Sequence, residues 1–300
     1  EELLGHGSPC AVTRRSAPTV ARRSGPLDRT VKRSGAYVAD VDDLGRFAEL
    51  MATPQPHLDV AMSLIAAAGR PEVDADHLVG RLDALADEVG HDDAAGIWAE
   101  LFGPEGRIGL RGDRVDYYDP ANSLLDRVLD RRLGIPITLS VIGMEVARRH
   151  GMELEGIGMP GHFLVGDRTT GHFLDAFDGG RNFGPEGAES LFHSLHGADQ
   201  PFEPTYLAPT SRTMIVVRVL NNLRGAHLRR GDRNGVAAAL RLQAALPGNA
   251  LAARRDLAGV LAADGRFIEA AEVHEALAVD DPDAGTEHEH AAMQLRARLN

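Results

Sequence analysis

Three positions of the sequence stand in the order that a thiol-dependent acyl-transfer site requires, but one of them cannot react. A helix starting just after Gly134 precedes a strand-like run with His162 and a second run with Asp175. In such a site the helix N-terminus stabilises a thiolate, the His accepts a proton and the carboxylate orients the His. The residue at the helix start is Pro136, which has neither a nucleophilic atom nor a backbone N–H. The sequence therefore predicts a His–Asp pair without its attacking group.

Two hydroxyl groups near the helix start are the alternative nucleophiles. Thr138 and Ser140 lie within the first turns, although such hydroxyls commonly bond to the preceding turn or pack against a neighbour. Ser123 is better explained as a helix cap, and the single cysteine, Cys10, is far away in the sequence. We expect a candidate pocket around the His–Asp pair. Its residues are Gly134, Pro136, Thr138, Ser140 and Phe163.

The predicted pair of His162 and Asp175 has two interpretations, which do not exclude each other. It could belong to a relict or repurposed pocket that binds an acyl, peptide or amide group. Alternatively, the imidazole is satisfied by its carboxylate inside a small sheet and holds a hairpin together.

Other histidines raise the question of a metal site. His193 and His196 are spaced for one helix face, His172 lies nearby in sequence, and His288 and His290 form a second group. None has the HExxH spacing, and local spacing fixes no third ligand. The glycines at 156, 158 and 161 do not form a phosphate-binding loop before a helix. We predict no metal and no cofactor.

The central positioning element is the predicted helix that follows Gly134. Pro136 suits a first helical position and Gly151 a C-terminal stop. Apolar residues cover more than half of its circumference, so we expect it to be buried centrally. The segments 152–167 and 171–180 read as two or three strands, with a hairpin turn at 167–171. This turn should bring His162 and Asp175 onto adjacent strands.

Helices dominate the rest of the chain. Four are predicted before the central helix, over 41–51, 58–68, 76–89 and 92–102, and 105–118 is expected to be a loop or small hairpin. Asn122 or Ser123 should cap a further helix. A short helix is expected around 189–195, within an otherwise loop-rich stretch. Helices followed by strands predict an α+β domain.

From Arg212 onward the sequence is helical with a period of 34 residues. Gly231 and Gly265 are related by this spacing, and so are the pairs Leu223/Leu257, Ala237/Ala271 and Ala244/Ala278. A 34-residue period is the tetratricopeptide spacing, in which each unit is a pair of antiparallel helices. The alternative is an unrelated helical bundle with a chance period. A final helix is expected at about 287–298.

Composition restricts the class of protein. The 300 residues suffice for about two domains, and the net charge of −12 argues against general nucleic-acid binding. We find no apolar run of membrane-spanning length and no signal peptide. One cysteine excludes an internal disulfide and indicates a reducing, cytoplasmic location. Residues 1–40 are basic and lack periodicity, which predicts a disordered extension.

The arrangement resembles the transglutaminase-like superfamily, whose core has a Cys at a helix start, a His strand and an Asp strand. With Gly134 and Gly151 matched to that helix, the family's Cys falls on Pro136, its His on His162 and its Asp on Asp175. More closely, NSLLDRVLDRRLGIPITLSVIGMEVARRHG followed by PGHFL is similar to the SirB-type bacterial branch. Members of that branch tend to carry tetratricopeptide repeats behind the transglutaminase-like domain.

The resulting prediction is an α+β protein with two domains. A transglutaminase-like (cysteine-proteinase-like) domain with N-terminal helices and a small antiparallel sheet spans 41–205, and an all-α tetratricopeptide stack spans 206–300. Because Pro136 replaces the nucleophile, we expect a non-catalytic module that binds a protein or peptide through the repeats. The alternative is a hydrolase or acyl transferase in which His162 and Asp175 activate a hydroxyl or water. The sequence indicates neither nucleic acid nor membrane as a partner and leaves the oligomeric state open.

Overall fold

The computed structural model describes residues 41–248 and 250–298. By its contacts the chain divides into the units 1–36 and 37–300, and all elements below belong to the second. The predictions made for residues 1–40, including the basic extension and Cys10, lie outside the described residues.

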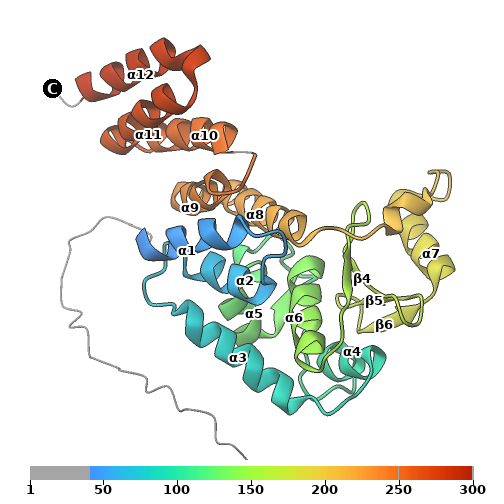
Figure 1. Cartoon of the computed structure of the whole chain (residues 1–300). Coiled ribbons are helices and arrows are strands. Elements are labelled where there is room, and N and C mark those ends of the chain that lie inside the picture. Colours follow the sequence, from blue (N-terminus) through green and yellow to red (C-terminus); the bar gives the residue numbers. More distant parts are fainter. Residues whose placement is uncertain (1–40, 249, 299–300) are drawn as a thin grey trace, which may run out of the picture. The chain divides into compact units, whose positions relative to one another are not determined.

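Helices precede a small sheet, and further helices follow it (Figure 1). The first group comprises α1 (Val41–Met51), α2 (Leu58–Ala67), α3 (Ala75–Glu88), α4 (Ala94–Phe102), α5 (Leu125–Arg131) and α6 (Pro136–Arg149). The strands are β1 (Arg111–Gly112), β2 (Leu133–Gly134), β3 (Glu155–Ile157), β4 (Leu164–Asp167), β5 (His172–Asp175) and β6 (Arg181–Phe183). The second group comprises α7 (Pro185–His196), α8 (Arg212–Arg229), α9 (Arg233–Ala244), α10 (Ala250–Ala263), α11 (Phe267–Asp280) and α12 (Gly285–Ala297). This order confirms the α+β class.

The central helix α6 is buried along most of its length, as predicted. Every residue from Pro136 to Ala147 is buried, and the helix contacts α2, α3, α4 and β4. Pro136 occupies the first turn, and Gly151 ends the segment with a φ of 80°. Gly143 faces the indole of Trp98, where a Cβ would lie 2.5 Å from the ring. The helix is thus fixed between layers by close packing.

The sheet that carries the candidate residues is antiparallel with the order β3–β4–β5–β6. Asp167 pairs with His172 across the β4–β5 turn, which confirms the predicted hairpin. His162, however, precedes β4, because the strand begins only at Leu164. The prediction of a strand His was therefore wrong by two residues. The backbone N–H of His162 instead donates to the Met159 carbonyl at 3.1 Å.

Of two local predictions before α6, one was confirmed in its loop alternative and the other was wrong. The segment 105–118 is a loop and not a hairpin, because its short strand β1 pairs in parallel with β2. The prediction that Asn122 or Ser123 caps the next helix was wrong, because Leu124 is the N-cap of α5 and makes no side-chain hydrogen bond. Asn122 instead donates to the carbonyls of Asp116 and Tyr117, at 2.8 and 3.4 Å. It therefore orders the preceding loop rather than the following helix.

The C-terminal helices pack as successive neighbours from α8 to α12. Gly231 and Gly265 have φ values of 68° and 77°, which glycine adopts without strain. The helices α9 and α11 begin two residues after these glycines, so the predicted 34-residue spacing is present in the backbone. Apolar residues of α8, including Ile215 and Val219, belong to the same core cluster as α6.

Candidate functional site

A hydrogen-bonded His–Asp pair lies at the centre of the candidate site. His162 Nε2 lies 3.0 Å from Asp175 Oδ2, and the Asp175 side chain has no solvent exposure. The other oxygen, Oδ1, accepts from the backbone N–H groups of Phe177 and Asp178 at 2.9 and 3.2 Å. Asp175 thus orients the imidazole and fixes the turn after β5.

Packing links the pair to the region before α6. The ring of Phe177 lies edge-on to His162, with centroids 6.1 Å apart, and a Cβ on Gly112 would be 2.5 Å from that ring. Gly112 in turn pairs with Gly134 in the β1–β2 ladder, two residues before Pro136. These contacts connect the His–Asp pair, through Phe177 and Gly112, to the strand that ends two residues before Pro136.

The start of α6 is closed to solvent. Pro136 is buried, and Thr138 and Ser140 have no exposed surface. Neither hydroxyl oxygen has a hydrogen-bond partner among the described residues. The two other predicted pocket residues, Gly134 and Phe163, are also buried. In this conformation none of the five offers surface to a substrate.

An arginine beside the pair was not anticipated from the sequence. Arg218 of α8 donates to the backbone carbonyl of His162 at 3.2 Å and lies over the ring of Phe163 at 5.3 Å. Burial lowers the pKa of Arg218, whereas its electrostatic interaction with Tyr117 acts to raise it. No carboxylate of the described residues lies within ion-pair distance of it. The only sequence signal was a basic residue within an apolar helical run.

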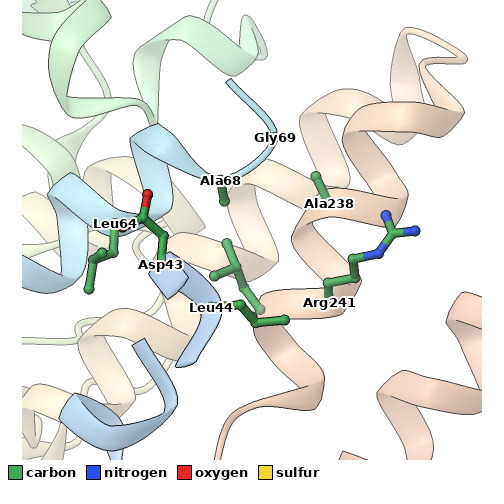
Figure 2. A pocket seen from close by; sticks show the side chains of 8 residues that line it. Asp43, Leu44, Leu64, Ala68, Gly69, Ala238 and Arg241 are labelled. Atoms are coloured by element: carbon green, nitrogen blue, oxygen red, sulfur yellow. The ribbon is translucent and has the colours of Figure 1, made fainter. Parts of the chain in front are cut away.

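A groove of about 670 Å³ lies between α1 and the helices α9, α10 and α11. Ala and Leu side chains line its interior, and Arg241, Arg254, Glu269 and Glu272 are its charged residues. An adjoining apolar pit of about 10 Å³ shares Leu44 and Arg241 with the groove. Figure 2 shows the side chains that line this pit. Arg241 forms an ion pair with Glu269 at 2.9 Å, and burial lowers the pKa of Arg241.

The other histidines make local contacts. His196 bonds to the Pro160 carbonyl at 3.0 Å and His172 to Asn182 at 2.9 Å. His193 lies 3.7 Å from Glu189. Over 41–248 and 250–298 we find no group of three side chains able to hold a metal ion.

None of the helices in the part of the chain described by the structure has the length and apolar character needed to cross a membrane.

Comparison with known proteins assigns the class. The family model of the transglutaminase-like superfamily matches residues 76–221, which include α6 and the His–Asp pair. The fold and this match define a transglutaminase-like domain.

Three relatives illustrate the similarity. A UPF0162 protein of Pseudomonas aeruginosa is 32% identical over 189 residues, covering 61% of this chain and 70% of that protein. A UPF0162 protein of Xylella fastidiosa is 40% identical over 134 residues, covering 42% of this chain and 48% of that protein. The human F-box only protein 21 is 39% identical over 74 residues, covering 24% of this chain and 12% of that protein. The chain thus matches about half the length of the Xylella relative. It belongs to the UPF0162 family.

Proposed function

We propose that the protein is a non-catalytic transglutaminase-like module that binds a peptide segment of a partner protein. The observation that carries the proposal is the closed start of α6, where Pro136 occupies the nucleophile position. A proline ring can form neither a thioester nor an ester. The hydroxyls nearest in sequence, on Thr138 and Ser140, have no exposed surface. A substrate carbonyl therefore has no attacking atom within reach.

Two features of the C-terminal helices support partner binding. Their 34-residue helix spacing is that of tetratricopeptide units, and we infer that α8–α11 are two such units with α12 as the final helix. The resemblance to SirB-type proteins agrees with this assignment. The groove beside α1 is lined by apolar residues together with a few charged ones, a composition typical of binding sites. The single cysteine supports a cytoplasmic location.

The binding site is tested by filling the groove. Ala276 lines it from an exposed position on α11, whereas Ala297 is exposed near the end of α12 and does not line it. A peptide would be selected from a displayed random library against the full chain, and its affinity measured for Ala276→Arg and Ala297→Arg. We expect about a tenfold loss or more in the first variant and none in the second. Equal affinities, or no selected peptide, would contradict the groove as the binding site.

Removal of residues 212–300 is an unsuitable test of partner binding. Ile215, Val216 and Val219 of α8 are fully or almost fully buried in the core that contains α6. Deleting them would expose this core, so lost binding would not identify a surface. The single-residue substitutions above avoid this problem.

A hydrolase is the second candidate, and the His162–Asp175 bond favours it. In that case His162 acts as a base for a hydroxyl or water, and the carboxylate orients it. A fluorophosphonate or acyl probe would distinguish the two functions. Labelling of Thr138 or Ser140 that disappears in His162→Ala supports the enzyme. No adduct at either hydroxyl is expected for the binding module.

A further inference from the structure

We propose that the face of α8 from Arg218 to Arg229 binds an extended acidic peptide segment. The inference rests on the proposed function in one respect: the protein binds a partner segment and does not transform it. The site on α8 is separate from the groove between α1 and α9–α11, because neither Arg218 nor Arg229 lines that groove.

Arg218 is the first anchor because its guanidinium is half-buried without an acidic partner. Among the described residues, Arg218 donates one hydrogen bond to the His162 carbonyl, lies over the ring of Phe163 and interacts with Tyr117. A guanidinium has five N–H donors, and a desolvated cation gains from a carboxylate. A peptide carboxylate would accept hydrogen bonds from the remaining N–H donors of this guanidinium.

Arg229 provides a second anchor on the same side of the helix. It is exposed and lies over the ring of Tyr118, at 4.1 Å from the centroid, and no ion pair involving it is present among the described residues. The two arginines are eleven positions apart, which is a rotation of about 20° beyond three full turns and a rise of about 16 Å. Asn222 and Gly225 lie between them on this face, and a Cβ at Gly225 would meet nothing within 4 Å. An extended chain covers that distance in about five residues.

Aromatic side chains flank this face. Tyr117 lies against Tyr118 and Phe177, with ring centroids 5.3 and 5.9 Å apart, and Phe177 contacts His162. Tyr117 and Tyr118 are 39% and 52% exposed. They therefore offer ring surface to the apolar parts of a bound segment while the arginines take its carboxylates.

The surrounding charges favour a peptide over a nucleic acid. Asp116 and Asp119 lie close to this face, where both pair with Arg230. A continuous phosphate chain would place negative charge beside these carboxylates at every step. A peptide can carry its carboxylates only where the unpaired arginines lie.

The test uses a capped seven-residue peptide with Glu at its second and sixth positions, which point to the same side of an extended chain, against a control peptide with Gln at both. Binding to the full chain is measured by fluorescence anisotropy at low salt. We expect Arg218→Gln and Arg229→Gln each to weaken binding by about tenfold or more. The matched control is Arg212→Gln, which removes a charge from another face of α8, where Arg212 lines a different cavity. It should leave binding unchanged. Arg218→Gln should also retain the urea midpoint of the wild type, which separates lost binding from unfolding.

Several results would overturn the inference. One is failure of the Glu peptide to bind, and another is binding of the Gln peptide with equal affinity. A third is an Arg212→Gln variant that weakens binding as much as the two test variants do, and a fourth is weaker binding in Arg218→Gln while Arg229→Gln leaves it unchanged. Full competition by a short oligothymidylate would assign the face to nucleic acid instead. Ala276→Arg should leave acidic-peptide binding intact, so failure here is distinguishable from failure of the groove.

Discussion

Replacing the buried carboxylate of Asp175 gives the sharpest prediction about the His–Asp pair. The side chain accepts three hydrogen bonds: one from His162 and two from the backbone N–H groups of Phe177 and Asp178. Asp175→Ala removes all three acceptors. Asp175→Asn keeps an amide oxygen for the two backbone donors and presents an NH₂ group to the imidazole, which can accept at Nε2 after changing tautomer.

The magnitudes follow from this count. The bond between the buried carboxylate and His162 contributes about 1.5–3 kcal/mol, and each backbone bond contributes about 1 kcal/mol. Asp175→Ala should therefore lower the free energy of unfolding by about 4 kcal/mol, a large share of a typical total of about 5–15 kcal/mol. Asp175→Asn loses mainly the charge assistance and should cost about 1–1.5 kcal/mol.

Urea unfolding followed by the fluorescence of Trp98, the single tryptophan of the chain, measures both values. Asp178→Ala is the matched control, because Asp178 forms exposed ion pairs with Arg114 and Arg181 and should cost less than about 1 kcal/mol. A loss below about 1 kcal/mol in Asp175→Ala, or equal losses in the Ala and Asn variants, would refute the structural role of the pair.

Three further predictions concern the core, the loop and the last helix. Gly143→Ala should destabilise the fold by about 1–3 kcal/mol, because its Cβ would lie 2.5 Å from Trp98; an unchanged urea midpoint would contradict the packing of α6 on α4. Asn122→Ala should cost about 1–3 kcal/mol, since it frees two loop carbonyls; hydrogen exchange that stays unchanged over 113–119 would be inconsistent with this role. His274 lies 3.1 Å from His288, and burial and the charge of that neighbour lower its pKa below 6.5. The neutral form therefore stabilises the α11–α12 contact above pH 6.5, and this contribution is lost as the pH falls below it; an equal drop of the urea midpoint between pH 7.5 and 5.5 in wild type and His274→Gln would disprove it.

Local sequence signals predicted the part of the site that depends on neighbouring residues. The hairpin turn after Asp167 brings Asp175 back beside the segment of His162, and the pair is indeed bonded. Pro136 at a helix start follows from backbone chemistry alone. Asn122 was misjudged because its amide bonds to carbonyls five and six residues earlier, whereas the sequence suggested a cap for the next helix.

Features that depend on distant contacts could not be predicted. The burial of Thr138 and Ser140 depends on which elements pack around α6. A hydropathy pattern does not show whether a hydroxyl faces a pocket or the core. Arg218 meets His162 across 56 positions of the chain. The groove requires α1 to lie beside α9–α11, and the 34-residue period contains no information about α1.

Closure of the nucleophile position is the central claim, and thiol accessibility at that position tests it most directly. A full-length variant combining Pro136→Cys with Cys10→Ser carries one thiol, at the start of α6. Its rate of reaction with a disulfide reagent would be measured in buffer and in concentrated urea, with correction for the intrinsic effect of urea. A buried position predicts a reaction at least about a hundredfold slower in buffer, because the thiol must wait for local opening. A thiol that reacts as fast in buffer as in urea, and more slowly once His162→Ala is added, would show an open and functional triad scaffold, which contradicts the account.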